Sequence, residues 1–305
     1  MSDMTLVTDG LHFPEGPVPL RDGRVLVVEI QTGTITAVSP DGAKEVVASP
    51  GGGPNGAAIG PDGKLYVCNN GGFEWHDMNG FLLPGEQPED YLGGRIQRID
   101  LDTGDVEDLY TECNGFGLRG PNDIVFDAHG GFWFTDHGKV RPREMDRGGL
   151  YYATTDGSSI TEVVHPLASP NGVGLSPDGA VVYVAETHTG RLWSWDVESP
   201  GVLAAPAVTP DRLLYDFPGY QLLDSLAVDG DGNICIATLI TGAITVVSPA
   251  GELVGVHPVP EYDPLVTNVC FGGPDHRTAY VTASGTGRLY SMTWPHTGLQ
   301  LQYER

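Results

Sequence analysis

The sequence predicts an all-β fold built from six copies of one structural unit. Each unit has two short apolar segments joined by a Gly-containing turn, followed by a third apolar segment. Val, Ile, Tyr, Phe, Trp and Thr recur in those segments, and this composition favours strands. The 43 Gly and 24 Pro residues fall mostly between the segments, so they indicate turns. Units of about 40 to 50 residues with four strands are typical of a β-propeller, here one with six blades.

The six units begin with one short motif whose middle residue is polar. In chain order the motifs are Pro14-Glu15-Gly16, Pro54-Asn55-Gly56, Pro121-Asn122-Asp123, Pro170-Asn171-Gly172, Leu223-Asp224-Ser225 and Thr267-Asn268-Val269. The first two apolar segments of most units are joined by Asp-Gly or Pro-Asp-Gly, as at residues 21–23, 61–63 and 177–179. Gly accepts the positive φ of a tight hairpin turn. A weaker fourth segment follows at residues 45–48, 106–110 and 162–164.

The segment before the first unit, residues 5–8, is expected to pair as the outer strand of the last blade. That pairing would close the circle and protect an open edge. The alternative for this segment is a disordered tail. A single blade cannot bury both of its faces, so residues 1–305 are expected to form one propeller domain.

Composition excludes several classes of partner. The formal net charge is −24, and an acidic surface repels phosphate backbones, so nucleic acid is not expected. No apolar stretch is long enough to span a membrane, and the first residues lack the features of a secretory signal. The four cysteines lie far apart and predict buried free thiols in a reduced, cytoplasmic protein. A small-molecule substrate is the expected partner, and the sequence gives no indication of the oligomeric state.

Residues 69–93 form the longest departure from the repeat. Long loops in a compact fold are usually functional or disordered, and the aromatic content argues against disorder. A lid or wall of a pocket is the functional interpretation, and a packing flap on the rim is the simpler one. The segment contains Phe73, Trp75, His76, Phe81, Leu82, Leu83 and Tyr91.

In a propeller the first strand of each blade lines a central channel, so the polar residues of the six motifs would converge near one mouth. Asn at the head of a strand is often only a turn former. That interpretation does not explain two carboxylates in register with four amides, because buried unpaired carboxylates are costly. Oxygen donors without thiolate or imidazole favour Ca²⁺, with Mn²⁺, Mg²⁺ or Zn²⁺ as alternatives. The ring consists of Glu15, Asn55, Asn122, Asn171, Asp224 and Asn268.

Other chemical motifs are weak or absent. Asp229-Gly-Asp231-Gly-Asn233 superficially resembles the start of a calcium loop, but Ile234 stands where Gly is required, so a hairpin turn is expected. No Gly-x-Ser-x-Gly elbow, phosphate loop or dinucleotide fingerprint is present. His137 and His188 follow second strands and lie within reach of a proton-shuttle role, although an ordinary loop histidine is the simpler interpretation.

The motifs in combination resemble the senescence-marker-protein/gluconolactonase/luciferin-regenerating-enzyme family over nearly the whole chain. The resemblance is carried by 13–17, 120–123, 132–136, 169–172 and 223–229, which are specific together and weak singly. It implies a six-bladed propeller with a divalent metal in the channel. Most characterised relatives hydrolyse lactones, and some hydrolyse organophosphates.

By this resemblance Glu15, Asn171 and Asp224 match direct metal ligands, and Asn122 matches a residue that ligates the metal or binds substrate beside it. Asp224 also matches the proposed general base, with the metal acting as a Lewis acid on the lactone carbonyl. Asn55, Asn122, Asn268 and Arg119 are candidate substrate-binding residues. One departure is Leu-Asp-Ser in the fifth motif, where many relatives have Pro-Asp-Gly, so the substrate shape is expected to differ too. Arg119 stands at a different offset from the nearby Arg of some lactonases.

Two other functions fit the same ring. The first is a hydrolase that acts on a phosphotriester or another electrophile at the same site. The second is a non-catalytic propeller, either a calcium-binding protein or an interaction scaffold, in which the ring is structural. A panel of lactones tested with and without chelator separates these possibilities.

Overall fold

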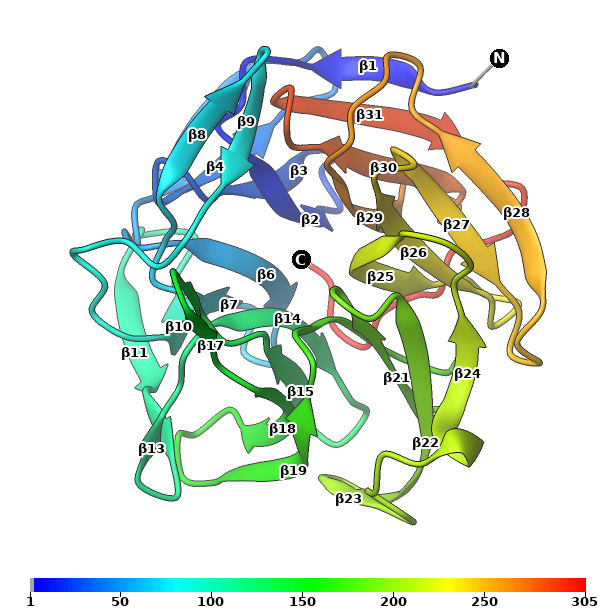
Figure 1. Ribbon diagram of the computed structural model, residues 1–305. Coiled ribbons are helices and arrows are strands. Elements are labelled where there is room, and N and C mark those ends of the chain that lie inside the picture. The colour runs from blue at the N-terminus through cyan, green and yellow to red at the C-terminus, as the bar shows by residue number, and fades with distance from the viewer. Residues whose placement is uncertain (1–2) are drawn as a thin grey trace.

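The computed structural model describes residues 3–305 and confirms the six-bladed propeller. Six antiparallel sheets surround a central channel (Figure 1). Five of them have four strands and one has five, and the strands follow the sequence order from the axis outward except in the last sheet, where β1 is outermost. We number the blades 1 to 6 in the order of their inner strands. Within the described residues, no helix has the length and hydrophobicity needed to cross a bilayer.

The strands of each blade follow the segments predicted from the repeat. The inner strands are β2 (Pro14–Pro19), β6 (Pro54–Ile59), β14 (Pro121–Phe126), β20 (Pro170–Leu175), β25 (Leu222–Val228) and β29 (Val266–Gly272). The second strands are β3 (Val25–Glu29), β7 (Leu65–Asn69), β15 (Gly131–Asp136), β21 (Val181–Glu186), β26 (Ile234–Leu239) and β30 (Thr278–Ala283). The third strands are β4 (Thr34–Val38), β10 (Arg95–Ile99), β18 (Gly148–Thr154), β22 (Arg191–Ser199), β27 (Ala243–Val247) and β31 (Arg288–Thr293).

The outer strands include one from the other end of the chain. They are β5 (Lys44–Ala48), β11 (Val106–Tyr110), β19 (Ile160–Leu167), β24 (Leu213–Asp216), β28 (Leu253–Pro258) and β1 (Thr5–Thr8). In blade 4, β22 also pairs with β23 (Val202–Leu203), and the 3₁₀ helix Pro210–Arg212 lies between β23 and β24. Strand β1 pairs antiparallel with β31, with Leu6 opposite Tyr290. The predicted closure of blade 6 by the first strand is therefore confirmed.

The hydrophobic core is divided among the contacts between neighbouring blades. The described residues form six clusters of buried apolar side chains, and each cluster joins two adjacent blades. For example, Val28 of blade 1 packs with Val67 of blade 2, and Trp133 of blade 3 packs with Val184 of blade 4. Each blade thus depends on two neighbours for its burial, as expected when no unit can bury its faces alone. All four cysteines are free thiols, and three of them are buried, as predicted.

Glycine in the opening motif allows neighbouring inner strands to approach closely. A Cβ atom on Gly16 would lie 2.3 Å from the carbonyl oxygen of Asn55 in the next blade. A Cβ atom on Gly172 would lie 2.6 Å from the amide nitrogen of Leu226. These distances are far inside van der Waals contact, so the inner strands can sit this close only because a side chain is missing there. The narrow channel follows from this contact.

Each inner strand also has a β-bulge at its polar residue. The pairing register with the second strand shifts between Glu15 and Val18 in blade 1, and between Pro121 and Ile124 in blade 3. The other four blades show the same irregularity at the equivalent place. A bulge bends the strand locally and redirects a side chain. The repeated bulge is the backbone feature found at every polar residue of the ring.

The insertion 69–93 is ordered and lies on the face of the propeller where the inner strands begin, which we call the entrance face. Its hairpin consists of β8 (Trp75–Met78) and β9 (Phe81–Pro84) (Figure 1). Trp75 and Leu82 pack against the core between blades 1 and 2, and the Leu82 N–H donates to Gly285 O of blade 6 at 2.9 Å. The insertion therefore combines packing with a fixed wall on the entrance face. Two smaller hairpins are formed by β12 (Glu112–Cys113) with β13 (Phe116–Gly117) and by β16 (Val140–Arg141) with β17 (Glu144–Met145).

The last residues of the chain cross the opposite end of the channel. After β31 the segment forms an isolated bridge between Gly298 and Asp229, and it ends where the Arg21 N–H donates to Arg305 O at 2.7 Å. Tyr303 packs edge-on against Phe126 with ring centroids 5.6 Å apart. The carboxyl end therefore lies near the centre of the ring in Figure 1.

We predict that Gly172→Ala destabilises the protein by about 3 kcal/mol, the upper part of the range for overpacking, because the added methyl meets backbone atoms that cannot rotate away. Urea unfolding measures the change. Gly117→Ala is the matched control, since a Cβ atom there meets only Thr111 O at 3.9 Å. Equal stability of the two variants would contradict the close-contact argument.

Candidate metal centre

The structure brings Glu15 and Asn268 into direct contact at the entrance end of the channel. The Nδ2 atom of Asn268 donates to Glu15 Oε2 at 2.7 Å, although the two residues are 253 positions apart. The same carboxylate oxygen accepts the Gly16 N–H at 2.5 Å. The Oδ1 atom of Asn268 accepts the Val269 N–H at 2.7 Å. Asn268 is thus engaged by the ring itself, which fits a supporting role better than the predicted substrate contact.

A second set of contacts joins blades 4 and 5. Asn171 Nδ2 donates to Thr187 Oγ1 at 3.2 Å, and Asn171 Oδ1 accepts from Ser225 Oγ at 3.4 Å. The Ser225 N–H donates to Asp224 Oδ1 at 3.1 Å. Ser225, the residue that departs from the pattern of many relatives, therefore links the metal-ligand candidates Asn171 and Asp224.

Two buried acceptor oxygens in this ring lack a partner. Glu15 Oε1 and Asn122 Oδ1 make no hydrogen bond with any group in residues 3–305. Glu15 is 2% exposed and Asn122 is 6% exposed, so bulk water does not compensate. A buried carboxylate or amide oxygen without a donor is costly, and a cation supplies what it lacks. The described residues contain no cluster of three or more His, Cys, Asp or Glu side chains suited to a metal, so this candidate site depends on amide oxygens as well as carboxylates.

The electrostatics of the ring also fit a cation. Removal from water raises the pKa of Asp224 to about 8, although the side chain is partly exposed. Burial, followed by the negative charge of Asp224, raises the pKa of Glu15 well above its usual range. The negative charge of Asp224 acts on Glu15, so the two carboxyl groups lie near enough to interact. A divalent cation between them would favour the ionised form of both.

Asp123 is a third acid of this centre, and its importance was missed from the sequence. Its Oδ1 accepts the Ile124 N–H at 2.9 Å, and its Oδ2 accepts the Val173 N–H of blade 4 at 3.2 Å. Burial raises the pKa of Asp123 to about 7, and its charge acts on both Glu15 and Asp224. The available signal was an acid in the third motif where three other motifs have Gly.

Comparison with known proteins agrees with this geometry. The family model of the SMP-30/Gluconolactonase/LRE-like region matches residues 13–285. The chain belongs to this family. The family resemblance inferred from the motifs is therefore confirmed.

Named relatives cover most of the chain. A lactonase drp35 from Staphylococcus saprophyticus is 33% identical over 257 residues, which are 84% of this chain and 70% of the relative. A solved gluconolactonase from Xanthomonas campestris shares the fold with a TM-score of 0.75 and 21% identity, covering 96% of this chain and 89% of that one. A calcium-binding regucalcin from Agrobacterium tumefaciens has a TM-score of 0.74 and 18% identity, covering 99% of both chains. At these identities the two structures show the shared fold alone.

Two further candidate substrate-binding residues, Asn55 and Arg119, lie in different parts of the structure. Asn55 is 5% exposed on β6, in register with the ring. Arg119 is exposed on the loop before β14, where its charge acts on Asp146 and Tyr91. It does not contribute to the shifted pKa of Glu15 or of Asp224. The structure thus brings Asn55 to the ring and directs Arg119 toward the outer loops.

The two histidines named from the sequence lie together on the entrance face. The ring centroids of His137 and His188 are 5.7 Å apart in an edge-on contact. Burial, followed by the charge of His188, lowers the pKa of His137 to about 3. His137 is therefore neutral at physiological pH.

A buried lysine fastens the insertion to blade 3. Lys139 Nζ donates to Gly72 O at 2.5 Å and lies 4.1 Å from the ring centroid of Phe73. It is only 1% exposed, and burial lowers its pKa to about 7. An ammonium ion over an aromatic ring gains a cation–π attraction that offsets part of its burial. The contact ties the wall of the entrance face to the loop that follows β15.

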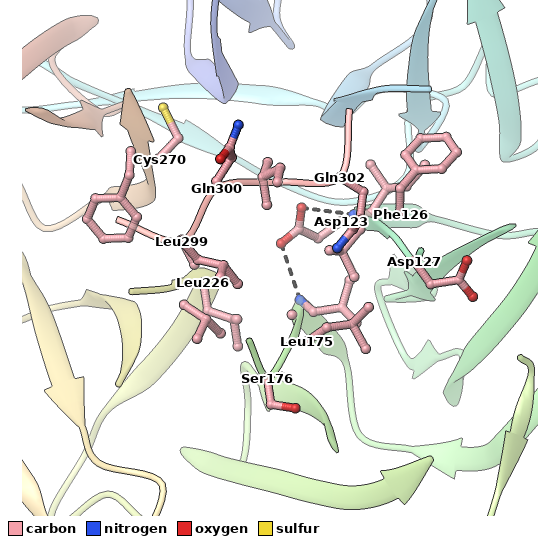
Figure 2. A pocket seen from close by; sticks show the side chains of 18 of the residues that line it. Asp123, Phe126, Asp127, Leu175, Ser176, Leu226, Cys270, Leu299, Gln300 and Gln302 are labelled. Carbon is pink, nitrogen blue, oxygen red and sulfur yellow. Dashed lines mark hydrogen bonds between the residues drawn. The ribbon is translucent and has the colours of Figure 1, made fainter. Parts of the chain in front are cut away.

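Below the ring, the channel contains a cavity of about 170 Å³. Figure 2 shows Leu175 and Leu226 on its sides and Leu299 to Gln302 of the chain end crossing it. Asp123 lies at its wall with both of its drawn hydrogen bonds directed to backbone N–H groups. The carboxyl-terminal segment thus covers this end of the channel.

We predict that Lys139 causes the free energy of unfolding to increase with pH. Its folded pKa of about 7 lies below the value of about 10.4 for an unfolded lysine. Between these values the folded state binds fewer protons, so its stability increases with pH. The stability of Lys139→Met should lack this pH dependence. Its free energy of unfolding, relative to that of the native protein, should therefore be largest below about pH 7.

Urea unfolding at several pH values between about 6 and 9 measures the difference. Lys64→Met is the control, because Lys64 is a partly exposed lysine paired with Asp100 at 3.5 Å. Parallel pH profiles for Lys139→Met and the native protein would contradict the prediction.

Proposed function

We propose that the protein is a divalent-metal-dependent hydrolase that opens the ring of a lactone. The observation that carries the proposal is the pair of unpartnered buried oxygens, Glu15 Oε1 and Asn122 Oδ1, together with the carboxyl group of Asp224, whose charge acts on Glu15. Membership of a family that includes named lactonases and gluconolactonases supports the reaction type.

Glu15, Asn122, Asn171 and Asp224 would hold the cation. Two carboxylates and two amide oxygens are hard donors, so Ca²⁺ is the preferred ion, with Zn²⁺, Mn²⁺ and Mg²⁺ as alternatives. The calcium-binding protein of the same fold supports this choice. Asn268 would keep Glu15 in place through its 2.7 Å hydrogen bond.

When bound, the cation would supply Lewis-acid polarisation of the lactone carbonyl. Asp224 would orient a water molecule toward the carbonyl carbon and accept its proton. A nearby cation lowers the pKa of a carboxylate, so the contribution of Asp224 would come mainly from its fixed position. Asn55 and Asn122 would direct their amide groups to substrate oxygens. The apolar cavity and the chain end would exclude water from the far side of the ring.

We predict that Glu15→Gln and Asp224→Asn both lower the rate of lactone hydrolysis, but for different reasons. Glu15→Gln removes only the negative charge of one ligand, so hydrolysis should return when the concentration of Ca²⁺ is raised. Asp224→Asn removes the negative charge of a ligand and also the base, so turnover at saturating Ca²⁺ should stay about 10²- to 10⁴-fold below that of the native protein. Acid release from a panel of sugar, aliphatic and aromatic lactones, followed by pH-stat, measures both.

Asp178→Asn is the control for losing one negative charge, since Asp178 lies in an exposed hairpin turn. Recovery of Asp224→Asn by Ca²⁺ alone would remove the base assignment. Absence of chelator-sensitive turnover on every lactone, with intact Ca²⁺ binding, would favour a non-catalytic calcium-binding propeller. Turnover of a phosphotriester in the same assay, without lactone turnover, would favour the second hydrolase function.

A further inference from the structure

Two of the candidate metal ligands follow a residue with an unusual backbone conformation. Ser169 has φ of 57° and stands two residues before Asn171, and Phe13 has φ of 58° and stands two residues before Glu15. Residues before proline usually adopt extended conformations, and positive φ is uncommon for any residue other than glycine. Each conformation therefore persists only where surrounding contacts hold it. The other non-glycine residues with positive φ are Asn79, Asn114, Ile240 and His276.

In blade 4 the loop after β21 holds Ser169. The side chains of Ser169 and His188 are hydrogen-bonded, with Oγ and Nδ1 2.5 Å apart. The Thr187 N–H donates to Ser169 O at 3.0 Å, and Thr187 Oγ1 accepts from Asn171 Nδ2 at 3.2 Å. Ser169 is fully buried, so water does not replace these partners. Two consecutive loop residues thus fix both the strained residue and the side chain of the ligand candidate.

In blade 1 the insertion supplies the equivalent contact. The rings of Trp75 and Phe13 have centroids 5.1 Å apart, and Phe73 packs edge-on against Trp75 at 6.0 Å. The Ile30 N–H donates to Phe13 O at 3.2 Å. Phe13 is 4% exposed, so Trp75 covers a strained residue that leads directly to Glu15.

We propose that His188 and Trp75 are positioning residues for the metal centre. His188 acts on Asn171 through Ser169, and Trp75 acts on Glu15 through Phe13. Loss of either contact lets the strained residue relax, and the ligand two positions along then moves out of the ring. The inference rests on the proposed metal-dependent function. It also assigns a role to the insertion, because Trp75 of the insertion would then influence the affinity of the ring for a cation.

A double-mutant cycle on Ser169 and His188 tests the blade 4 part. Ser169→Ala, His188→Ala and the double variant are compared for Ca²⁺ affinity by calorimetry. Residues that orient a metal ligand typically change affinity about 10- to 100-fold when replaced, so each single variant should lose that much. Because the two residues act through one hydrogen bond, the double variant should lose no more than either single variant.

The control is Asn114→Ala. Asn114 has φ of 53° in the exposed turn between β12 and β13, outside the opening motif of blade 3. It should lose stability but keep its Ca²⁺ affinity. Lower melting temperatures with unchanged Ca²⁺ affinity in the His188 and Ser169 variants would overturn the proposal. His188→Gln replaces His188→Ala in the same comparison if the alanine variant does not fold.

Trp75→Ala and Trp75→Phe test the blade 1 part. Phenylalanine keeps an aromatic face against Phe13, so Trp75→Phe should retain most of the Ca²⁺ affinity that Trp75→Ala loses. Equal affinities for both variants and the native protein would remove this half of the proposal.

Asp224→Asn separates failure of this inference from failure of the metal centre. If Asp224→Asn weakens Ca²⁺ binding while the His188 and Trp75 variants bind as the native protein does, only the positioning roles are wrong. If Asp224→Asn binds Ca²⁺ as well as the native protein does, the ring is not the metal site and both proposals fall.

Discussion

The close approach of the six inner strands is the constraint on which the site depends. Gly16 and Gly172 lack the Cβ atoms that would force neighbouring strands apart, and the bulges occur at the same level of the channel. Polar side chains from distant parts of the sequence therefore lie at the same end of the channel, and some of them are in direct contact. The hydrogen bond between Glu15 and Asn268 closes the circle between the first and last blades. The geometry of the ring is thus a consequence of backbone packing rather than of local turn preferences.

The convergence of buried carboxyl groups at the ring is electrostatically unfavourable, and the hydrogen bonds of the protein offset it only in part. Glu15, Asp123 and Asp224 are carboxyl groups within mutual influence, and burial raises the pKa of all three. Asp123 is compensated by backbone N–H donors from two blades, whereas Glu15 keeps one oxygen without a partner. The two acids therefore differ in role. The hydrogen bonds of Asp123 stabilise the backbone, whereas the unpartnered oxygen of Glu15 is available to a ligand. A cation fits this arrangement through both charge and coordination.

The repeat predicted the six blades and the closing role of β1, because the strands and turns depend on local patterns that recur along the chain. The cross-blade contact of Asp123 could not be predicted, since its partner Val173 is brought to it only by the packing of blades 3 and 4. Arg119 shares its segment with Asn122 but directs its charge toward Asp146, which sequence distance does not reveal. The strained conformations of Phe13 and Ser169 also depend on tertiary contacts with Trp75 and His188. Features that break the six-fold repeat were therefore the ones that sequence patterns missed.

The departures from symmetry determine how the ring faces its surroundings. The insertion and Lys139 build a wall on the entrance face, and Leu299 to Gln302 close the far end over apolar side chains. The low-dielectric region behind the ring strengthens the electrostatic interactions of its charged groups, because charges interact more strongly where water is excluded. The same asymmetry means that a change in the wall alters the ring itself, since Trp75 contacts Phe13 and Phe13 leads directly to Glu15.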